Sequence, residues 1–172
     1  MKRLVALAGL VALAGCSGPG GSGAPPAGVK FDTSLPMDEF MLHVVDPAGQ
    51  AFWRGAGVEL TEAGEKDLSP TDEAGWEALV TAASTVAEAG NALQLPGRAR
   101  APEAEWNRLA QEMTARALDA RKAADAHDKQ AVFDTGGRLY ETCVACHAKY
   151  VIGPSGPAKP LPDFPADVPA PK

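Results

Sequence analysis

Apolar residues recur at spacings of three and four through two long stretches of this chain, which is the pattern of amphipathic helices. The first stretch starts at Ser69 and Pro70, predicted as the N-cap and first helical residue. It stops at Leu95-Pro96-Gly97. The second starts at Pro102 and runs to about Ala124. The apolar positions are Trp76, Leu79, Val80, Ala83, Val86, Ala87 and Leu93, then Trp106, Leu109, Ala110, Met113, Ala117 and Ala124.

Two further helices are predicted at the ends of this region. The first opens at Leu35-Pro36, and we expect a kink or break at Asp46-Pro47, because proline disturbs a helix interior. Residues 50–57 can continue it before a Gly-rich, acidic loop that runs to Ser69. The last helix runs from about Lys129 to about Val151. The apolar stripe of the first helix is Met37, Phe40, Met41, Val44 and Ala48.

No stretch alternates apolar and polar residues as a half-buried strand does, so the predicted class is all-α. Four helical segments in sequence with modest loops predict an antiparallel four-helix bundle. Gly136-Gly137 interrupts the last helix, where glycine weakens it and can mark close packing against a neighbour.

The two ends of the chain have other compositions. Lys2 and Arg3 precede a short apolar run, and Leu13-Ala14-Gly15-Cys16 matches a lipoprotein signal-peptidase site. We therefore expect residues 1–15 to be a signal peptide and Cys16 to carry lipid, with an ordinary signal peptide and a free thiol as the alternative. Residues 16–35 are predicted as a flexible tether, 36–152 as the domain and 153–172 as a Pro-rich tail that is extended or draped over the domain.

The charge is acidic throughout. Without Lys2 and Arg3, 14 basic and 22 acidic residues remain, a formal charge of −8. A nucleic-acid binder needs the opposite sign, so that class is excluded. An acidic domain suits a basic partner, although solubility is the ordinary explanation for such a charge.

The most specific motif is Cys143-Val144-Ala145-Cys146-His147. Cys-x-x-Cys-His is the attachment signature of haem c, in which both thiols bond to the haem vinyl groups and the histidine becomes the proximal iron ligand. A zinc site would need a second ligand pair, and Cys16 is the one other cysteine. A thioredoxin-like pair would follow a strand in an α/β pattern, which is missing here. The export signal fits haem attachment outside the cytoplasm.

A single such motif near the end of the last helix of an all-α domain resembles the class II c-type cytochromes, the cytochrome c prime group and its methionine-ligated relatives. The resemblance covers about residues 31–152. Class I cytochromes carry the motif early and a ligand methionine downstream, whereas no Met or His follows His147. The resemblance implies that the first helix covers the distal face of one covalent haem c.

The distal ligand stays open among several residues. Met37 and Met41 are four apart and share a helix face, whereas His43 lies about 160° round from Met41. Met41 is the first choice and Met37 the second, beside a vacant apolar site. Both methionines can equally be core filler. Two other donors, Met113 and His127, are considered as well, His127 as a solvated loop residue.

The remaining candidates are mostly structural. Arg98 and Arg100 can pair with haem propionates, but solvation is the ordinary interpretation. Trp53, Trp76 and Trp106 are predicted as buried anchors. No catalytic group is found, so the chain is not predicted to be an enzyme.

The function predicted from the sequence is single-electron transfer by a monohaem c-type cytochrome, tethered by lipid on the periplasmic side of a bacterial membrane. Its partners would be redox proteins or a respiratory complex, and a homodimer is left open. The alternative is a five-coordinate haem that binds nitric oxide or another small gas.

Overall fold

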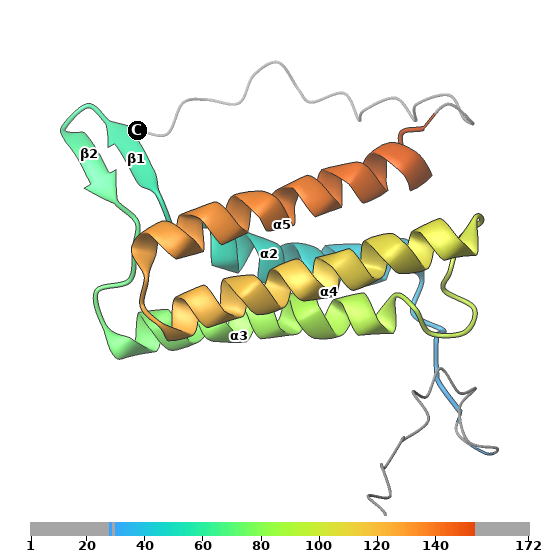
Figure 1. Ribbon diagram of the computed structural model, residues 1–172. Coiled ribbons are helices and arrows are strands. Elements are labelled where there is room, and N and C mark those ends of the chain that lie inside the picture. The colour runs from blue at the N-terminus through green and yellow to red at the C-terminus, as the bar shows by residue number, and fades with distance from the viewer. Residues whose placement is uncertain (1–27, 29, 154–172) are drawn as a thin grey trace, which may run out of the picture. The chain divides into compact units, whose positions relative to one another are not determined.

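Four helical segments dominate the computed structural model, which describes Gly28 and residues 30–153 (Figure 1). The chain divides into two compact units, Met1–Lys30 and Phe31–Lys172, and all four segments belong to the second. The first segment comprises α1 (Met37–Phe40), a π-helical turn (Met41–Val45) and α2 (Asp46–Trp53). The others are α3 (Glu73–Ala92), α4 (Glu103–Asp125) and α5 (Lys129–Tyr150). The fold is mostly helical, as an all-α class requires.

The helix does not break at Asp46-Pro47. It continues through Pro47, which lies in the first turn of α2, and a π-turn precedes it. The Asp46 N–H donates to the carbonyl of Met41, five residues back. Proline has no N–H and crowds the carbonyl four residues earlier, so one wider turn before it keeps the helix continuous. The expected kink is thus replaced by a π-turn that begins at Met41.

Helix α3 begins later than Ser69 and Pro70 predicted. Its N-cap is Asp72, whose carboxylate accepts a hydrogen bond from the Gly75 N–H at 2.8 Å. Ser69 instead donates its N–H to Asp67, also at 2.8 Å. Aspartate is as good an N-cap as serine, and Ser69 is already engaged by the preceding turn.

The other two helix starts agree with the sequence. Pro102 is the N-cap of α4. Asp128 caps α5 by accepting from the Ala131 N–H at 3.0 Å, and the helix ends at Tyr150, one residue before the predicted end.

A small hairpin occupies the segment predicted to be an acidic loop. Strand β1 (Val58–Thr61) pairs antiparallel with β2 (Gly64–Asp67), and Gly64 has a φ of 116° at the turn. The prediction of a loop was wrong because every residue of both strands is exposed. A strand without a buried face has no alternation to detect.

Two hydrophobic clusters hold the helices together, since α3 packs along α4, α4 along α5, and α2 against α3. One cluster includes Phe40, Val86, Leu93, Trp106, Met113 and Leu139, with Met37, Met41 and Tyr150 packed against it. The other includes Phe52, Trp76, Leu79, Ala83 and Val132.

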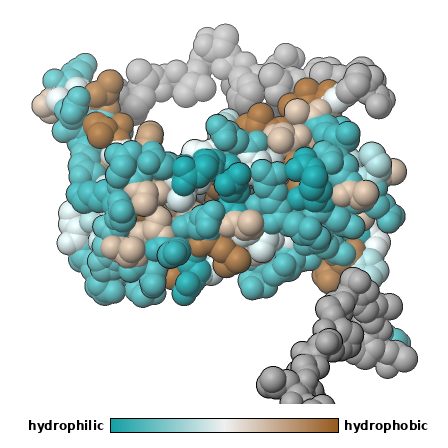
Figure 2. Space-filling model, in the orientation of Figure 1, coloured by the Kyte–Doolittle hydropathy of each residue, from teal (hydrophilic) through white to brown (hydrophobic). Residues whose placement is uncertain are grey.

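Most of the visible surface is hydrophilic, and apolar residues emerge at the hairpin and beside α5 (Figure 2). Val58 and Leu60 are exposed on the hairpin, and Val144, Val151 and Ile152 are exposed on or just after α5. In the part of the chain that the structure describes, no helix is both long and apolar enough to cross a membrane. Cys16, the signal peptide and nearly all of the predicted tether and tail lie outside the described residues.

Candidate haem-binding site

The two thiols and the imidazole of the motif lie on the last two turns of α5. Cys143 and Cys146 are half-buried free cysteines, and His147 is exposed. Because residues three and four apart lie on the same side of a helix, Cys143 is adjacent to both of the others. The local sequence places the three donors without further help from the fold.

Two adjoining apolar spaces lie beside these donors. The inner one is a small cavity of about 40 Å³ between α4, α5 and the π-turn. The outer one is an open cleft of about 450 Å³. Both are lined by Met41, Trp106, Cys146 and His147, so they are continuous at the site.

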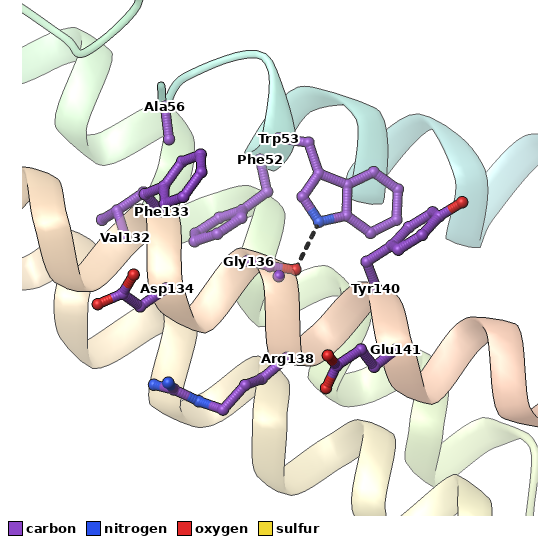
Figure 3. Close-up of a pocket in the computed structure, with 11 residues that line it drawn as sticks. Phe52, Trp53, Ala56, Val132, Phe133, Asp134, Gly136, Arg138, Tyr140 and Glu141 are labelled. Atoms are coloured by element: carbon purple, nitrogen blue, oxygen red, sulfur yellow. Dashed lines mark hydrogen bonds between the residues drawn. The ribbon is translucent and has the colours of Figure 1, made fainter. Parts of the chain in front are cut away.

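The cleft exists because the first helical segment and α5 diverge at this end of the molecule. No Cα atom of Met37–Val45 comes within 8 Å of a Cα atom of α5. At the other end the seam is closed, since the Trp53 indole N–H donates to the carbonyl of Gly136 at 3.0 Å and its ring meets Tyr140 edge-on (Figure 3). The seam therefore opens where the cysteines are.

The residues of this opening fit a covalent haem. Two thiols and an imidazole flank an apolar space, and a methionine thioether lines the same space, which are the donors that haem c uses. The inner cavity alone is too small for a macrocycle, but the cleft is within the range of about 300–1,000 Å³ typical of ligand sites. Among residues 30–153, no group of three His, Cys, Asp or Glu side chains is assembled as a metal-binding set.

The candidate distal donors are not equivalent in position. Met41 lines both the inner cavity and the outer cleft, whereas Met37 lines the cleft alone. His43 is largely exposed and contacts Glu39 at 3.0 Å. His127 lies between α4 and α5 and stacks on Trp76, with ring centroids 4.8 Å apart. Neither histidine lines the cavity or the cleft.

Met113 of α4 is closer to the motif than its treatment in the sequence suggested. It is 6% exposed and lines the inner cavity together with Cys143 and Cys146. Trp106, Ala110 and Met113 recur at four and three along α4, so a shared face could have indicated this contact. The helical pattern alone did not show that this face meets α5.

The two arginines differ in environment. Arg100 lines the cleft and donates from Nη1 to the Tyr150 carbonyl at 3.2 Å, with its guanidinium 6.0 Å from the Trp106 ring centroid. Arg98 lies over the Phe40 ring at 4.6 Å, and its Nε and Nη1 are buried without a hydrogen-bond partner. Solvation therefore describes Arg100 only in part and Arg98 poorly.

The predicted tryptophan anchors are mostly buried. Trp76 and Trp106 are 7% and 3% exposed, and the Trp106 indole donates to the Leu93 carbonyl at 2.7 Å. Trp53 is only partly buried, since it lies at the closed end of the seam.

Both thiols are held in the protonated form. Burial raises the pKa of Cys143 to about 11, with a further contribution from Cys146, and burial also raises the pKa of Cys146. Reactive dithiols of the thioredoxin type have lowered pKa values instead. This environment favours thiols that are protected until a partner group enters the cleft.

We expect the haem-free folded chain to react slowly with iodoacetamide. At pH 8 a thiol with a pKa near 11 is about 0.1% thiolate, so unfolding in urea should accelerate alkylation of Cys143 by about 100-fold. Peptide mass spectrometry across a pH series measures this. A midpoint for Cys143 below pH 8 would indicate a reactive redox pair.

Comparisons with protein-family models, curated proteins and solved structures find no match to this chain.

Proposed function

We propose that this chain is a lipid-anchored c-type cytochrome whose four helical segments form an antiparallel four-helix bundle around one haem c. The observation that carries the proposal is that Cys143, Cys146 and His147 line one apolar opening together with Met41. The class II resemblance supports the same arrangement through the position of the motif on the last helix.

Each residue has a separate task in this proposal. The thiols of Cys143 and Cys146 would form thioether bonds, which fix the cofactor to α5. The neutral imidazole of His147 would donate a nitrogen lone pair as the proximal ligand, and Met41 would offer its sulfur from the opposite helix. Bound haem supplies one-electron cycling between ferrous and ferric iron. The apolar walls from Trp106 and Val45 would exclude water.

The arginine of the cleft has an electrostatic task. Arg100 places a positive charge beside Cys146, His147 and Tyr150. A guanidinium binds carboxylates with paired hydrogen bonds, so Arg100 is the side chain placed to pair with a haem propionate. Arg98 does not line the cleft and is assigned no such role.

Absorption spectra of the purified full chain, produced with haem-maturation machinery, test this function. Electron transfer with Met41 as sixth ligand predicts low-spin iron in both oxidation states, a weak near-infrared band when oxidised, and no reaction with carbon monoxide. High-spin iron that binds carbon monoxide would replace electron transfer by the gas-binding alternative.

The lipid anchor is tested separately. The wild type should partition into detergent extracts of membranes and resist high salt, because several acyl chains together give stable anchoring. Cys16→Ala should remain uncleaved by lipoprotein signal peptidase or be released, whereas the neighbouring control Ser17→Ala should behave as wild type. Release of the wild type by salt alone would contradict lipidation.

A further inference from the structure

An aromatic groove lies at the closed end of the seam, distinct from the opening near the cysteines. It is a hollow of about 420 Å³ between α2 and α5. Figure 3 shows the rings of Phe52, Trp53, Phe133 and Tyr140 gathered on the side of α5 that faces α2, with Asp134 and Arg138 carried away from them. Phe133 and Tyr140 are 58% and 57% exposed, which is unusual for side chains of this size.

The floor of this groove contains a glycine that the described structure leaves unexplained. A Cβ at Gly136 would lie 3.3 Å from Phe52, so packing within the domain requires that glycine. A Cβ at Gly137 would meet nothing within 4 Å, although glycine weakens a helix interior. Gly137 lies four residues after Phe133 and three before Tyr140, so the helix has a notch between two exposed rings. Such a notch suits an occupant that approaches the backbone closely.

The chain itself supplies a segment suited to this groove. Residues 154–172 carry prolines at 154, 157 and 160, and again at 162 and 165. A spacing of three places the prolines on one face of a polyproline II helix, which has three residues per turn. Proline-rich segments of this kind bind in grooves lined by aromatic rings. The preformed extended backbone loses little entropy on binding.

The length of the segment matches the distance. Gly137 lies 14 residues before Val151 on α5, about 21 Å along the helix. About seven residues in polyproline II conformation span that distance at about 3.1 Å each. A reversal near Gly153 and Pro154 would therefore bring residues 160–162 to the notch. Because the segment is covalently attached, its effective concentration is about millimolar, and a weak contact suffices.

We propose that the Pro-rich segment 154–165 folds back along α5 and packs its prolines against Phe133, Tyr140 and the Gly137 notch. The occupant is this segment of the same chain, and the site is independent of haem. The proposal can therefore fail while the proposed function stands, and the reverse also holds.

Photo-crosslinking of the full chain tests the contact directly. Phe133 is replaced by p-benzoylphenylalanine, because its tryptic peptide, residues 130–138, excludes the haem cysteines. Irradiation should give an intramolecular adduct between that peptide and residues 158–165. The same probe at Leu118, which is 51% exposed on α4, is the matched control and should give about tenfold less tail adduct.

Two variants keep the test sharp. Gly137→Leu should lower the adduct yield from position 133 about tenfold, because a side chain fills the notch without a clash inside the domain. Replacing Pro157, Pro160 and Pro162 by serine should do the same and leaves the helical residues untouched. Adducts to a second copy, equal tail adducts from positions 133 and 118, or yields insensitive to both variants would overturn the proposal.

Discussion

Replacing Cys143 and Cys146 together by alanine should abolish covalent haem attachment, which is the largest effect that this account predicts. Both thiols lie in the wall of the same opening, and no other cysteine is found among residues 30–153. Protein from cells with maturation machinery should then lose all haem to acid-acetone, as measured by the absorbance of the protein pellet. Each single variant should keep one thioether bond at reduced yield.

The control for this pair lies inside the same motif. Val144 is 48% exposed and does not line the cavity or the cleft. Val144→Ala should therefore attach haem at the wild-type level. Loss of haem in Val144→Ala as well would show that attachment depends on helix stability rather than on the two thiols.

Replacing Met41 by alanine should convert the haem from low spin to high spin. Met41 lines both the inner cavity and the outer cleft, so its sulfur is the donor opposite α5 that reaches both. Loss of a thioether ligand removes stabilisation of ferrous iron, so the reduction potential should fall as carbon monoxide gains access. Absorption spectra with and without carbon monoxide, together with a redox titration, measure the change.

Two other methionines are matched controls for Met41. Met37→Ala should keep the low-spin spectrum and lose about 1–2 kcal/mol of unfolding free energy, because this side chain is only half-buried. Met113→Leu preserves volume in the inner cavity and should also stay low-spin. A spin change in either control, with Met41→Ala unaffected, would transfer the ligand role to that methionine.

The sequence predicted the helices well because each buries an apolar stripe. Leu79, Leu109 and Leu139 are each 3% exposed or less, and each lies in a segment that was recognised by its periodicity. The hairpin at Val58–Asp67 was missed because all its residues are exposed. Sequence patterns report burial, so elements without a buried face are not detected.

Local chemistry also limited the prediction at helix starts and breaks. Ser69-Pro70 is a good start signal, but Asp72 competes for the same cap and forms the hydrogen bond. At Pro47 the expected break became a π-turn, since the helix can widen before a proline. Such choices between nearly equivalent local arrangements depend on neighbours that a short sequence window does not include.

The candidate site was only partly predictable. Cys143, Cys146 and His147 are fixed by spacing on one helix, and the stripe on the first helix indicated Met41. The contributions of Met113 and Arg100 depend on which faces of α4 and the preceding loop meet α5. That contact is a property of tertiary packing and has no signature within either segment.

The most direct test of the central claim is acid-acetone extraction of the full wild-type chain after maturation, followed by intact mass measurement and a pyridine haemochrome spectrum. The account predicts that haem stays with the protein, that the mass increases by one haem, and that the spectrum is that of a haem with two thioether bonds. Complete extraction of the haem, with both Cys143 and Cys146 then open to alkylation in urea, would contradict the account.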